Sequence, residues 1–253
     1  MYNQNSHTYE IIEVCLLAGK VMLQSGAETY RVEDTMMRIA KAFGIEVTQS
    51  YVTPTVIIFS ADGVEPTITK LIRILDRTTD LTKVTMVNSI SRQISDGGVS
   101  HQQALHLLKE IDTSDISFPL LAKIMAAAIV SGCFLIMFDG QWGDFIPSVI
   151  SGGLGYIGVI YFHKLVPVKF FAEFLASFII GLVALVCVNT GLGNELDKII
   201  IGSVMPLVPG VLITNAVRDL MAGHLVSGLS KGAEAFITAI AIGSGIAVVL
   251  SLM

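Results

Sequence analysis

Residues 118–138 read FPLLAKIMAAAIVSGCFLIMF, an apolar run whose one charged side chain, Lys123, lies a turn from its start. A helix of about 20 such residues is long enough to cross the hydrocarbon core of a bilayer. Similar runs follow at 144–162, 170–188, 198–217 and 233–253. Soluble proteins rarely carry such runs in succession, so the sequence predicts an all-α membrane bundle of five transmembrane helices.

The charged residues are distributed unevenly around these runs. The chain is 53% hydrophobic and 15% charged, whereas soluble domains contain about 25% charged residues. Most of the Lys, Arg, Asp and Glu residues precede the first run. We therefore expect a cytoplasmic domain at 1–115 and a membrane domain at 116–253. The net charge of −5 and the lack of a basic stripe argue against a nucleic-acid partner.

The first 115 residues have the pattern of a small α+β domain. Helical spacing of apolar residues covers 9–23 and 29–43, with Gly44 as a C-cap. Three segments rich in β-branched residues follow at 46–53, 55–62 and 67–74, which predicts a small antiparallel sheet. Two more helices are expected at 79–95 and 100–111, the second capped by Ser100.

Basic residues near the ends of the runs predict the orientation in the membrane. His163, Lys164 and Lys169 lie between the second and third runs, and Arg218 and Lys231 lie between the fourth and fifth. Loops rich in Lys and Arg stay in the cytoplasm. The polar start of the chain has no signal-peptide pattern. We expect a multi-pass protein of the cytoplasmic membrane, with a cytoplasmic N-terminus and a C-terminus outside.

The fourth run is interrupted by Pro206, Pro209 and Gly210. Each proline lacks an N–H and disrupts the helix one turn before it. An unpaired carbonyl in hydrocarbon costs several kcal/mol, so a broken helix persists only against protein or water. The break therefore indicates a substrate or ion path. A packing kink in a passive helix is the alternative.

Several charged side chains flank the predicted spans. Asn215 and Asp219 are four apart and share a helix face. Asp219, Glu173 and Glu234 are all expected at the cytoplasmic end, where they could form a polar vestibule or couple transport to protons. For Asp219, an interfacial salt bridge with Arg218 is the alternative.

One motif of the first domain, GAETYRVEDT, begins with Gly26-Ala27-Glu28 ahead of an acidic helix start. A turn between two helices, with Glu28 near the positive N-terminus of the second, would suffice to explain it. The domain has no phosphate-binding loop, and its histidines lack companions at metal-ligand spacing. We therefore expect no catalytic site, no metal and no cofactor.

Three segments carry a resemblance to a known family: SGAETYRVEDTMMRIAKAFG at 25–44, YVTPTVIIFS at 51–60 and MPLVPGVLITNAVRDLMAGHLVSGLSKG at 205–232. The chain resembles the threonine/serine exporter family, bacterial membrane exporters with a cytoplasmic N-terminal domain. The resemblance covers nearly the whole chain in the order of the family.

The resemblance also implies a partner. Single-chain members carry a second membrane block, whereas this chain is similar to the larger subunit of a split form. Its partner would be a small, separately encoded membrane subunit of about five spans, inverted relative to this one as in other secondary transporters. A higher oligomer is left open. Some split relatives are linked to succinate export, so the substrate could be a threonine/serine-type amino acid or a small dicarboxylate.

The leading hypothesis is therefore a subunit of a bacterial secondary exporter driven by an ion gradient, with protons as the expected coupling ion. In it the break at 206–210 opens the backbone and Asn215 binds polar substrate groups. Asp219 couples protons or holds Arg218. A non-transporting regulatory or scaffolding subunit is the main alternative. A membrane-embedded enzyme is not expected, because only the loop residues His163 and His224 could serve as its base.

Overall fold

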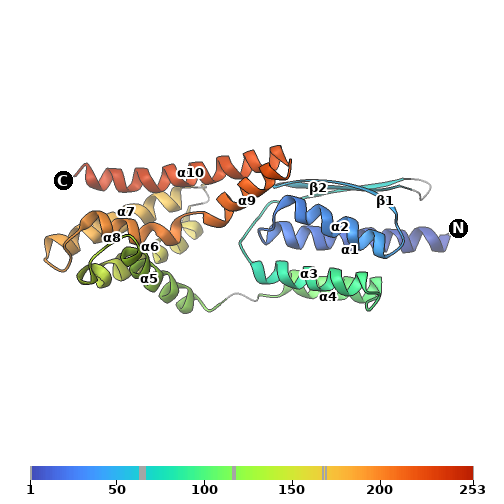
Figure 1. Cartoon of the computed structure of the whole chain (residues 1–253), viewed down its shortest axis with the longest axis horizontal. Helices are drawn as coiled ribbons and strands as arrows, with labels where there is room; N and C mark the ends of the chain where they lie inside the picture. The colour runs from blue at the N-terminus through green and yellow to red at the C-terminus, as the bar shows by residue number, and fades with distance from the viewer. Residues whose placement is uncertain (1, 63–66, 116–117, 167, 169, 253) are drawn as a thin grey trace. The chain divides into compact units, whose positions relative to one another are not determined.

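The computed structural model describes residues 2–62, 67–115, 118–166, 168 and 170–252; Lys169, used above for the orientation, lies outside them. The described chain forms two compact units, and Figure 1 labels most of their elements. Unit 1 comprises Met1–Ser117 and Val211–Ala233, and unit 2 comprises Phe118–Gly210 and Glu234–Met253.

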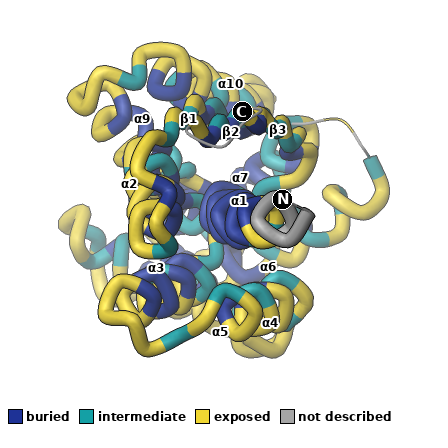
Figure 2. Tube along the Cα trace, turned by 90° about the vertical axis from the view of Figure 1, so that its right-hand side faces the viewer, coloured by how far each residue is buried: buried dark blue, intermediate teal, exposed yellow. Residues whose placement is uncertain are grey.

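A central helix organises unit 1. The helix α1 (Tyr2–Gln24) packs against α2 (Thr29–Ala42), α3 (Leu81–Ser95), α4 (His101–Thr113) and the sheet. Figure 2 shows that much of its length is buried. Its apolar residues point in every direction, which is the pattern of a helix enclosed on all sides.

The sheet of unit 1 has three antiparallel strands in the order β1 (Val47–Thr53), β2 (Val56–Asp62), β3 (Ile68–Arg73). The antiparallel pairing predicted from the sequence is confirmed. Alternation along β2 turns Ile57 and Phe59 into the core of unit 1, where both are fully buried.

Two glycines end the first two helices, α1 and α2. Gly26 has a φ of +86°, and the N–H of Ala27 donates to the Met22 carbonyl at 3.0 Å. Gly44 ends α2 in the same way with a φ of +87°. Glycine adopts this left-handed conformation without the steric cost of a Cβ atom. The segment at Gly26 is thus the turn between two helices that the sequence allowed.

Unit 2 is helical and closely packed. Glycines on its second helix allow near approach: an added Cβ at Gly152 would lie 1.9 Å from Ser131 Oγ, and one at Gly155 would lie 2.3 Å from Ile180. Its elements are α5 (Leu120–Met137), η1 (Trp142–Asp144), α6 (Phe145–Leu165), α7 (Phe171–Asn189), α8 (Leu196–Val204), η2 (Met205–Leu207) and the part of α10 from Glu234 onward.

Four described helices are long and apolar enough to cross a membrane, namely Leu120–Met137, Trp142–Leu165, Phe171–Asn189 and Leu225–Leu250. A fifth span results only if Leu196–Leu207 and Gly210–Met221 are counted together. The prediction of several apolar spanning helices is therefore supported, and the number of spans is four or five.

The fourth apolar run differs from a continuous helix. It ends as an α-helix at Val204, continues as the short 3-10 helix η2, and resumes as α9 (Gly210–Met221). Val208 is extended, with φ −64° and ψ 127°, and its N–H donates to the Met205 carbonyl at 3.2 Å. Pro209 has no N–H for that carbonyl, so the 3-10 bond takes its place.

The helix α10 (Leu225–Leu250) begins eight residues before the fifth run that hydropathy delimits at 233. Gly223, with a φ of +87°, makes the short turn from α9. The segment 225–232 contains the polar residues Ser227 and Lys231. These residues lower its hydropathy, so the predicted apolar run begins only at 233. Both side chains are buried inside unit 1.

Candidate functional site

The hairpin formed by α9 and the first turns of α10 has an unusual distribution of side chains. Within unit 1, its polar residues Asn215, Asp219 and Lys231 are buried. Its apolar residues point outward: Met221 is 84% exposed and Leu229 is 66% exposed. A water-facing helix pair has the reverse arrangement. The outer face of this hairpin is therefore suited to lipid or to another apolar surface.

Asp219 lies at the centre of the buried polar side chains and is fully enclosed. Its Oδ1 accepts from the Thr29 N–H at 2.9 Å, and its Oδ2 accepts from the Thr29 hydroxyl at 2.9 Å and from Lys231 Nζ at 2.7 Å. Thr29 is the first residue of α2, whose N–H has no partner within the helix. Asp219 thus caps α2 from a distant part of the sequence.

Lys231 and Asn215 hold the turn that leads into α2. Lys231 Nζ also donates to the Ala27 carbonyl and to the Thr29 hydroxyl, both at 3.3 Å. Asn215 Nδ2 donates to the Gly26 carbonyl at 2.7 Å. The buried ammonium is therefore paired and hydrogen-bonded, which offsets much of the cost of removing it from water.

Glu28 binds two arginines at the edge of the same cluster. Its Oε1 accepts from Arg218 Nη1 at 2.5 Å and its Oε2 accepts from Arg31 Nη1 at 3.1 Å. Burial alone would raise the pKa of Glu28. Its own backbone N–H and the two arginines outweigh that effect and hold the pKa below the ordinary value.

Glu33 has the opposite perturbation. Burial raises its pKa above the ordinary value, and the charge of Asp219 acts in the same direction. The Val52 N–H, which donates to Glu33 Oε1 at 2.8 Å, and His224, whose Nδ1 is 3.8 Å away, only partly oppose this rise. Glu33 is thus a carboxylate poised to take up a proton more readily than an exposed one.

We call these residues the α2 cluster. It brings together two segments that the resemblance rested on, and it contains six of the residues singled out from the sequence. Arg218 pairs with Glu28, whereas Asp219 pairs with Lys231, an arrangement that the sequence alternatives did not include. The α2 cluster consists of Gly26, Ala27, Glu28, Thr29, Glu33, Asn215, Arg218, Asp219, His224 and Lys231.

The remaining candidates lie in unit 2. Pro206 is within η2, and Pro209 precedes α9. Glu173, in the first turn of α7, lies 3.2 Å from His163 Nε2, and its other carboxylate oxygen is buried without a hydrogen-bond partner among the described residues. The backbone carbonyl of Glu234 accepts from the Thr238 hydroxyl at 3.0 Å.

Sequence reasoning did not single out Thr29, Glu33 or Lys231 as site residues. Lys231 is 12 positions from Asp219 and Thr29 is 190 away, so no periodicity links them. One signal was available for Lys231, because it lies at the start of an apolar run and is 3% exposed once folded. A lysine placed so close to a span needs a partner or water.

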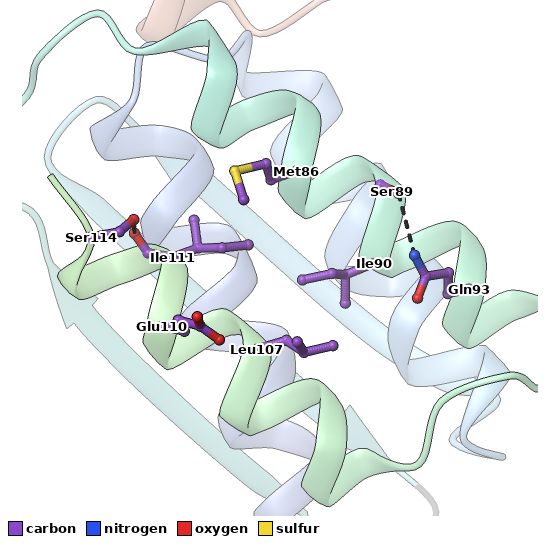
Figure 3. A pocket seen from close by; sticks show the side chains of 8 residues that line it. All are labelled: Met86, Ser89, Ile90, Gln93, Leu107, Glu110, Ile111 and Ser114. Atoms are coloured by element: carbon purple, nitrogen blue, oxygen red, sulfur yellow. Dashed lines mark hydrogen bonds between the residues drawn. The ribbon is translucent and has the colours of Figure 1, made fainter. Parts of the chain in front are cut away.

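A groove of about 440 Å³ lies between α3 and α4 in unit 1 (Figure 3). Its lining mixes apolar and polar side chains, and the Gln93 amide donates to the Ser89 hydroxyl at 3.4 Å. One of the eight residues is a carboxylate and none is a histidine, cysteine or cation, so Glu110 is the single charged side chain of this lining. The lining residues are Met86, Ser89, Ile90, Gln93, Leu107, Glu110, Ile111 and Ser114.

The α2 cluster is rich in carboxylates, but they are engaged by amides, hydroxyls and cations. Across the described residues, no group of three or more His, Cys, Asp or Glu side chains has the arrangement of a metal site. The cluster is therefore an ion-pair and hydrogen-bond network within unit 1.

Comparison with known proteins assigns the chain to a class. The profile of the family described as "Putative threonine/serine exporter" matches residues 13–253. The chain belongs to this family, which is a family of membrane transporters and not of enzymes. With its apolar helices, this membership makes the chain a multi-pass membrane protein.

Individual relatives are distant in sequence. A "Probable threonine/serine exporter" of Mycobacterium tuberculosis is 25% identical over 92% of this chain, which spans 44% of that relative. A "Probable succinate transporter subunit YjjP" of Escherichia coli is 24% identical, with 98% of this chain and 97% of the relative covered. The "Threonine/serine exporter" of Corynebacterium glutamicum is 22% identical, and the chain spans 52% of it. The search of solved structures found no match.

Proposed function

We propose that this chain is a subunit of a secondary exporter that moves a small polar metabolite out of a bacterial cell. The substrate is a threonine/serine-type amino acid or a small dicarboxylate such as succinate, as the names of its relatives suggest. The word "subunit" in the name of a relative of nearly equal length supports a separately encoded membrane partner for this chain as well.

The observation that carries this proposal is the α2 cluster. It ties the N-terminal segment, through Thr29 and Glu28, to the hairpin that directly follows the break at 206–210. A break in an apolar helix is where secondary transporters bind and release solutes. Because the α2 cluster binds the hairpin that follows the break, it would transmit movements of the broken helix to α2. In this role Asp219 and Lys231 anchor the hairpin, while Asn215 fixes the turn at Gly26.

The composition of unit 1 also supports the proposed orientation. Residues before 118 and residues 211–233 belong to the same compact unit. This membership favours the same side of the membrane for the residues before 118 and for the end of 211–233 that leads into α10. Basic residues in 211–233 and the absence of long apolar runs before 118 favour the cytoplasmic side. The N-terminus would be cytoplasmic and the end of α10 outside.

Proton coupling is the remaining part of the proposal. Among the three candidate carboxylates, Asp219 accepts three hydrogen bonds and is fully enclosed. Glu173 keeps one buried oxygen without a partner among the described residues and has His163 at 3.2 Å. A carboxylate in contact with an imidazole is an arrangement through which a proton can be passed. We therefore assign coupling to the Glu173–His163 pair, and an anchoring role to Asp219.

Export from reconstituted vesicles tests the proposal. Vesicles containing the full chain with its partner are loaded with radiolabelled threonine, serine or succinate, and efflux is followed with and without a pH gradient. We expect efflux of one substrate class that is accelerated by the gradient. Glu173→Gln should abolish the acceleration, whereas Asp34→Asn, at an exposed i,i+4 pair with Arg38, should leave it unchanged.

The same assay separates transport from regulation. Vesicles that contain only the partner should be inactive if this chain contributes to the path. Full efflux by the partner alone, merely changed in rate by this chain, would instead make this chain a regulatory subunit.

A further inference from the structure

Unit 2 contains a line of fully buried polar side chains among apolar neighbours. Leu135, Ile180 and Ile199 belong to its hydrophobic core. Asp144 and Ser148 are nevertheless buried in the same unit with 0% exposure. Buried polar groups in a membrane-spanning unit are costly and usually have a function.

The line begins at Asp144, the residue before α6. Its Oδ1 accepts from the Asn194 N–H at 2.6 Å, and its Oδ2 accepts from the Glu195 N–H at 3.2 Å. Both amides lie at the start of α8, where N–H groups have no helical partner. One oxygen of Glu195 is itself buried and, in the described chain, without a hydrogen-bond partner.

The line continues one turn along α6 at Ser148, which lies on the same face as Asp144. The Ser148 hydroxyl donates to the Ser131 carbonyl on α5 at 3.0 Å and lies 3.3 Å from the Ser203 hydroxyl on α8. The Ser203 hydroxyl can donate to the Ser148 carbonyl at 3.2 Å. Ser203 is the last residue but one of α8, directly before the break. The line thus runs from the start of α8 to its end, directly before the break.

A further hydroxyl on this helix lacks a partner. Ser151, one turn beyond Ser148 on α6, is 0% exposed, and no residue that the structure describes bonds to its Oγ. Leaving a buried hydroxyl unpaired destabilises the folded state. That cost is removed if a polar group enters between the helices and binds it.

We propose that Asp144, Ser148, Ser151 and Ser203 line the route of the solute through unit 2, and that the route favours solutes with ammonium or hydroxyl donors. This assignment rests on the proposed export function, and it adds a location and a chemistry. Each hydroxyl has one hydrogen and two acceptor lone pairs. The hydroxyl hydrogens of Ser148 and Ser203 can be donated to backbone carbonyls. The hydrogen-bonding capacity left for a solute is then mainly the lone pairs of the hydroxyl oxygens, which accept from donors.

The charge of the line supports the same preference. Asp144 is its one ionisable member, and its amide partners supply no full positive charge. Asp144 has no ion pair with the residues that the structure describes, so a dicarboxylate would be repelled by its negative charge. An ammonium group would be attracted to it. The line therefore fits an amino acid with a hydroxyl side chain better than succinate.

Gly152 marks the narrowest point of the route. A Cβ atom there would lie 1.9 Å from Ser131 Oγ and 3.4 Å from the Ser203 carbonyl. Helices must separate slightly at this point for a solute to pass. The route is thus closed in this state, as expected of a transporter that alternates between states.

Thiol accessibility in the full chain tests the route. Single cysteines are introduced as Ser148→Cys and Ser203→Cys in a background where Cys15, Cys133 and Cys187 are replaced. Ser177→Cys is the matched control: Ser177 is also 0% exposed, but it lies on α7, where its hydroxyl donates to the Phe174 carbonyl at 2.9 Å. Membrane vesicles are treated with a small charged methanethiosulfonate, which reaches only thiols in contact with water.

We expect the two route variants to react at least about tenfold faster than Ser177→Cys, because changes of conformation open the route to water. Millimolar threonine should slow their reaction, and succinate should not. Equal rates at all three positions would overturn the route. Protection by succinate and not by threonine, or by neither, would overturn the preference for donors.

Export kinetics supply a second measurement if a cysteine disturbs packing. Ser148→Ala should raise the KM for export several-fold, whereas Ser177→Ala should leave it unchanged; equal effects would contradict the route. Thiol access is measured without any export assay. Reactive route thiols in vesicles that export nothing would therefore count against the proposed function alone, and unreactive thiols in exporting vesicles would count against the route alone.

Discussion

Asp219 and Lys231 form the ion pair on which the α2 cluster depends, with side chains 0% and 4% exposed. Asp219→Asn keeps an oxygen for the Thr29 N–H but leaves the ammonium without a counter-charge. Removing one partner of a buried pair costs about 3–5 kcal/mol. In Asp219→Asn we expect unit 1 to open at least about a hundredfold more often than in wild type, since each 1.4 kcal/mol corresponds to a factor of ten.

Cys15 provides the measurement, because it is fully buried in the core of unit 1 and burial raises its pKa. Its rate of alkylation, in a chain with Cys133→Ser and Cys187→Ser, reports how often unit 1 opens. Asp219→Asn combined with Lys231→Met should recover much of the loss, because no charge is then left unpaired. Asp34→Asn, at an exposed pair, should change the rate by less than about fivefold. An Asp219→Asn rate equal to wild type would contradict the anchoring role.

Glu28 and Glu33 should affect stability in opposite directions as the pH changes. The pKa of Glu28 is below its ordinary value of 4.5, so its stabilising contribution is complete above that pH and is lost as the pH falls through the folded value. The pKa of Glu33 is above 4.5, so the folded state binds its proton more tightly. Its contribution to stability therefore increases as the pH falls toward 4.5.

Hydrogen exchange of the α2 amides, corrected for intrinsic rates, measures both effects. The protection of wild type relative to Glu33→Gln should rise between pH 7 and the ordinary pKa of Glu33. Relative to Glu28→Gln, it should stay constant over that range and fall only at lower pH. Parallel profiles for the two variants would show that the assigned directions are wrong.

Single residues of the α2 cluster were only partly predictable. Asn215, Arg218 and Asp219 stand out because they are polar side chains at the end of an apolar run. Glu28 stands out in a motif of its own, but its pairing with Arg218 and that of Thr29 with Asp219 leave no signal, because each pair is 190 positions apart. Arg218 adjoins Asp219 in sequence and yet binds Glu28, since consecutive residues on a helix point in different directions.

At the scale of elements, the turn between α1 and α2 depends on Gly26. An alanine there must adopt a φ of +86°, and its Cβ would lie 3.2 Å from the Thr78 carbonyl oxygen. The conformation alone costs about 1–2 kcal/mol. Gly44→Ala is the matched control, because Gly44 has a φ of +87° and nothing within 4 Å of an added Cβ. Cys15 alkylation should therefore be faster in Gly26→Ala than in Gly44→Ala; equal rates would mean that the close approach to Thr78 has no cost.

The break between α8 and α9 depends on its prolines. Pro209→Ala restores an N–H that could donate to the Met205 carbonyl, which now accepts from Val208 at 3.2 Å. The segment would then gain a route to continuous helix. We expect export in the vesicle assay to fall at least about tenfold, with normal insertion and unchanged Cys15 protection. Export at the wild-type rate would show that the proline is a packing kink, as the sequence alternative held.

The elements themselves were largely predictable from local patterns. β-Branched segments and bounding turns gave the three antiparallel strands, and hydropathy gave the apolar helices. The start of α10 was not predictable in this way. Ser227 and Lys231 lower the hydropathy of 225–232, but the Val52 and Ala27 carbonyls accept hydrogen bonds from them. Such long-range bonds leave no periodic signal.

At the scale of the whole molecule, the number of spans decides on which side α10 ends. If α8 and α9 cross the membrane together, five crossings place residue 252 opposite the N-terminal domain. If they enter and return on one side, four crossings place it on the same side. The bond between Asp219 and the Thr29 N–H favours five crossings for a domain that stays in the cytoplasm, because four crossings would place 211–233 outside.

Single cysteines and a membrane-impermeant thiol reagent measure this on intact cells. Leu192→Cys lies in the exposed loop after α7, Lys109→Cys lies on α4, and Leu252→Cys follows α10; these residues are 66%, 58% and 69% exposed. We expect labelling of Leu192→Cys and Leu252→Cys in intact cells, and of Lys109→Cys only after permeabilisation. Leu252→Cys is the decisive variant, because its side of the membrane differs between four and five crossings. Leu192→Cys and Lys109→Cys are expected on the same side in both cases. Protection of Leu252→Cys in intact cells would mean that the broken helix is re-entrant. The bond between Asp219 and Thr29 would then have to form in a different assembly of unit 1.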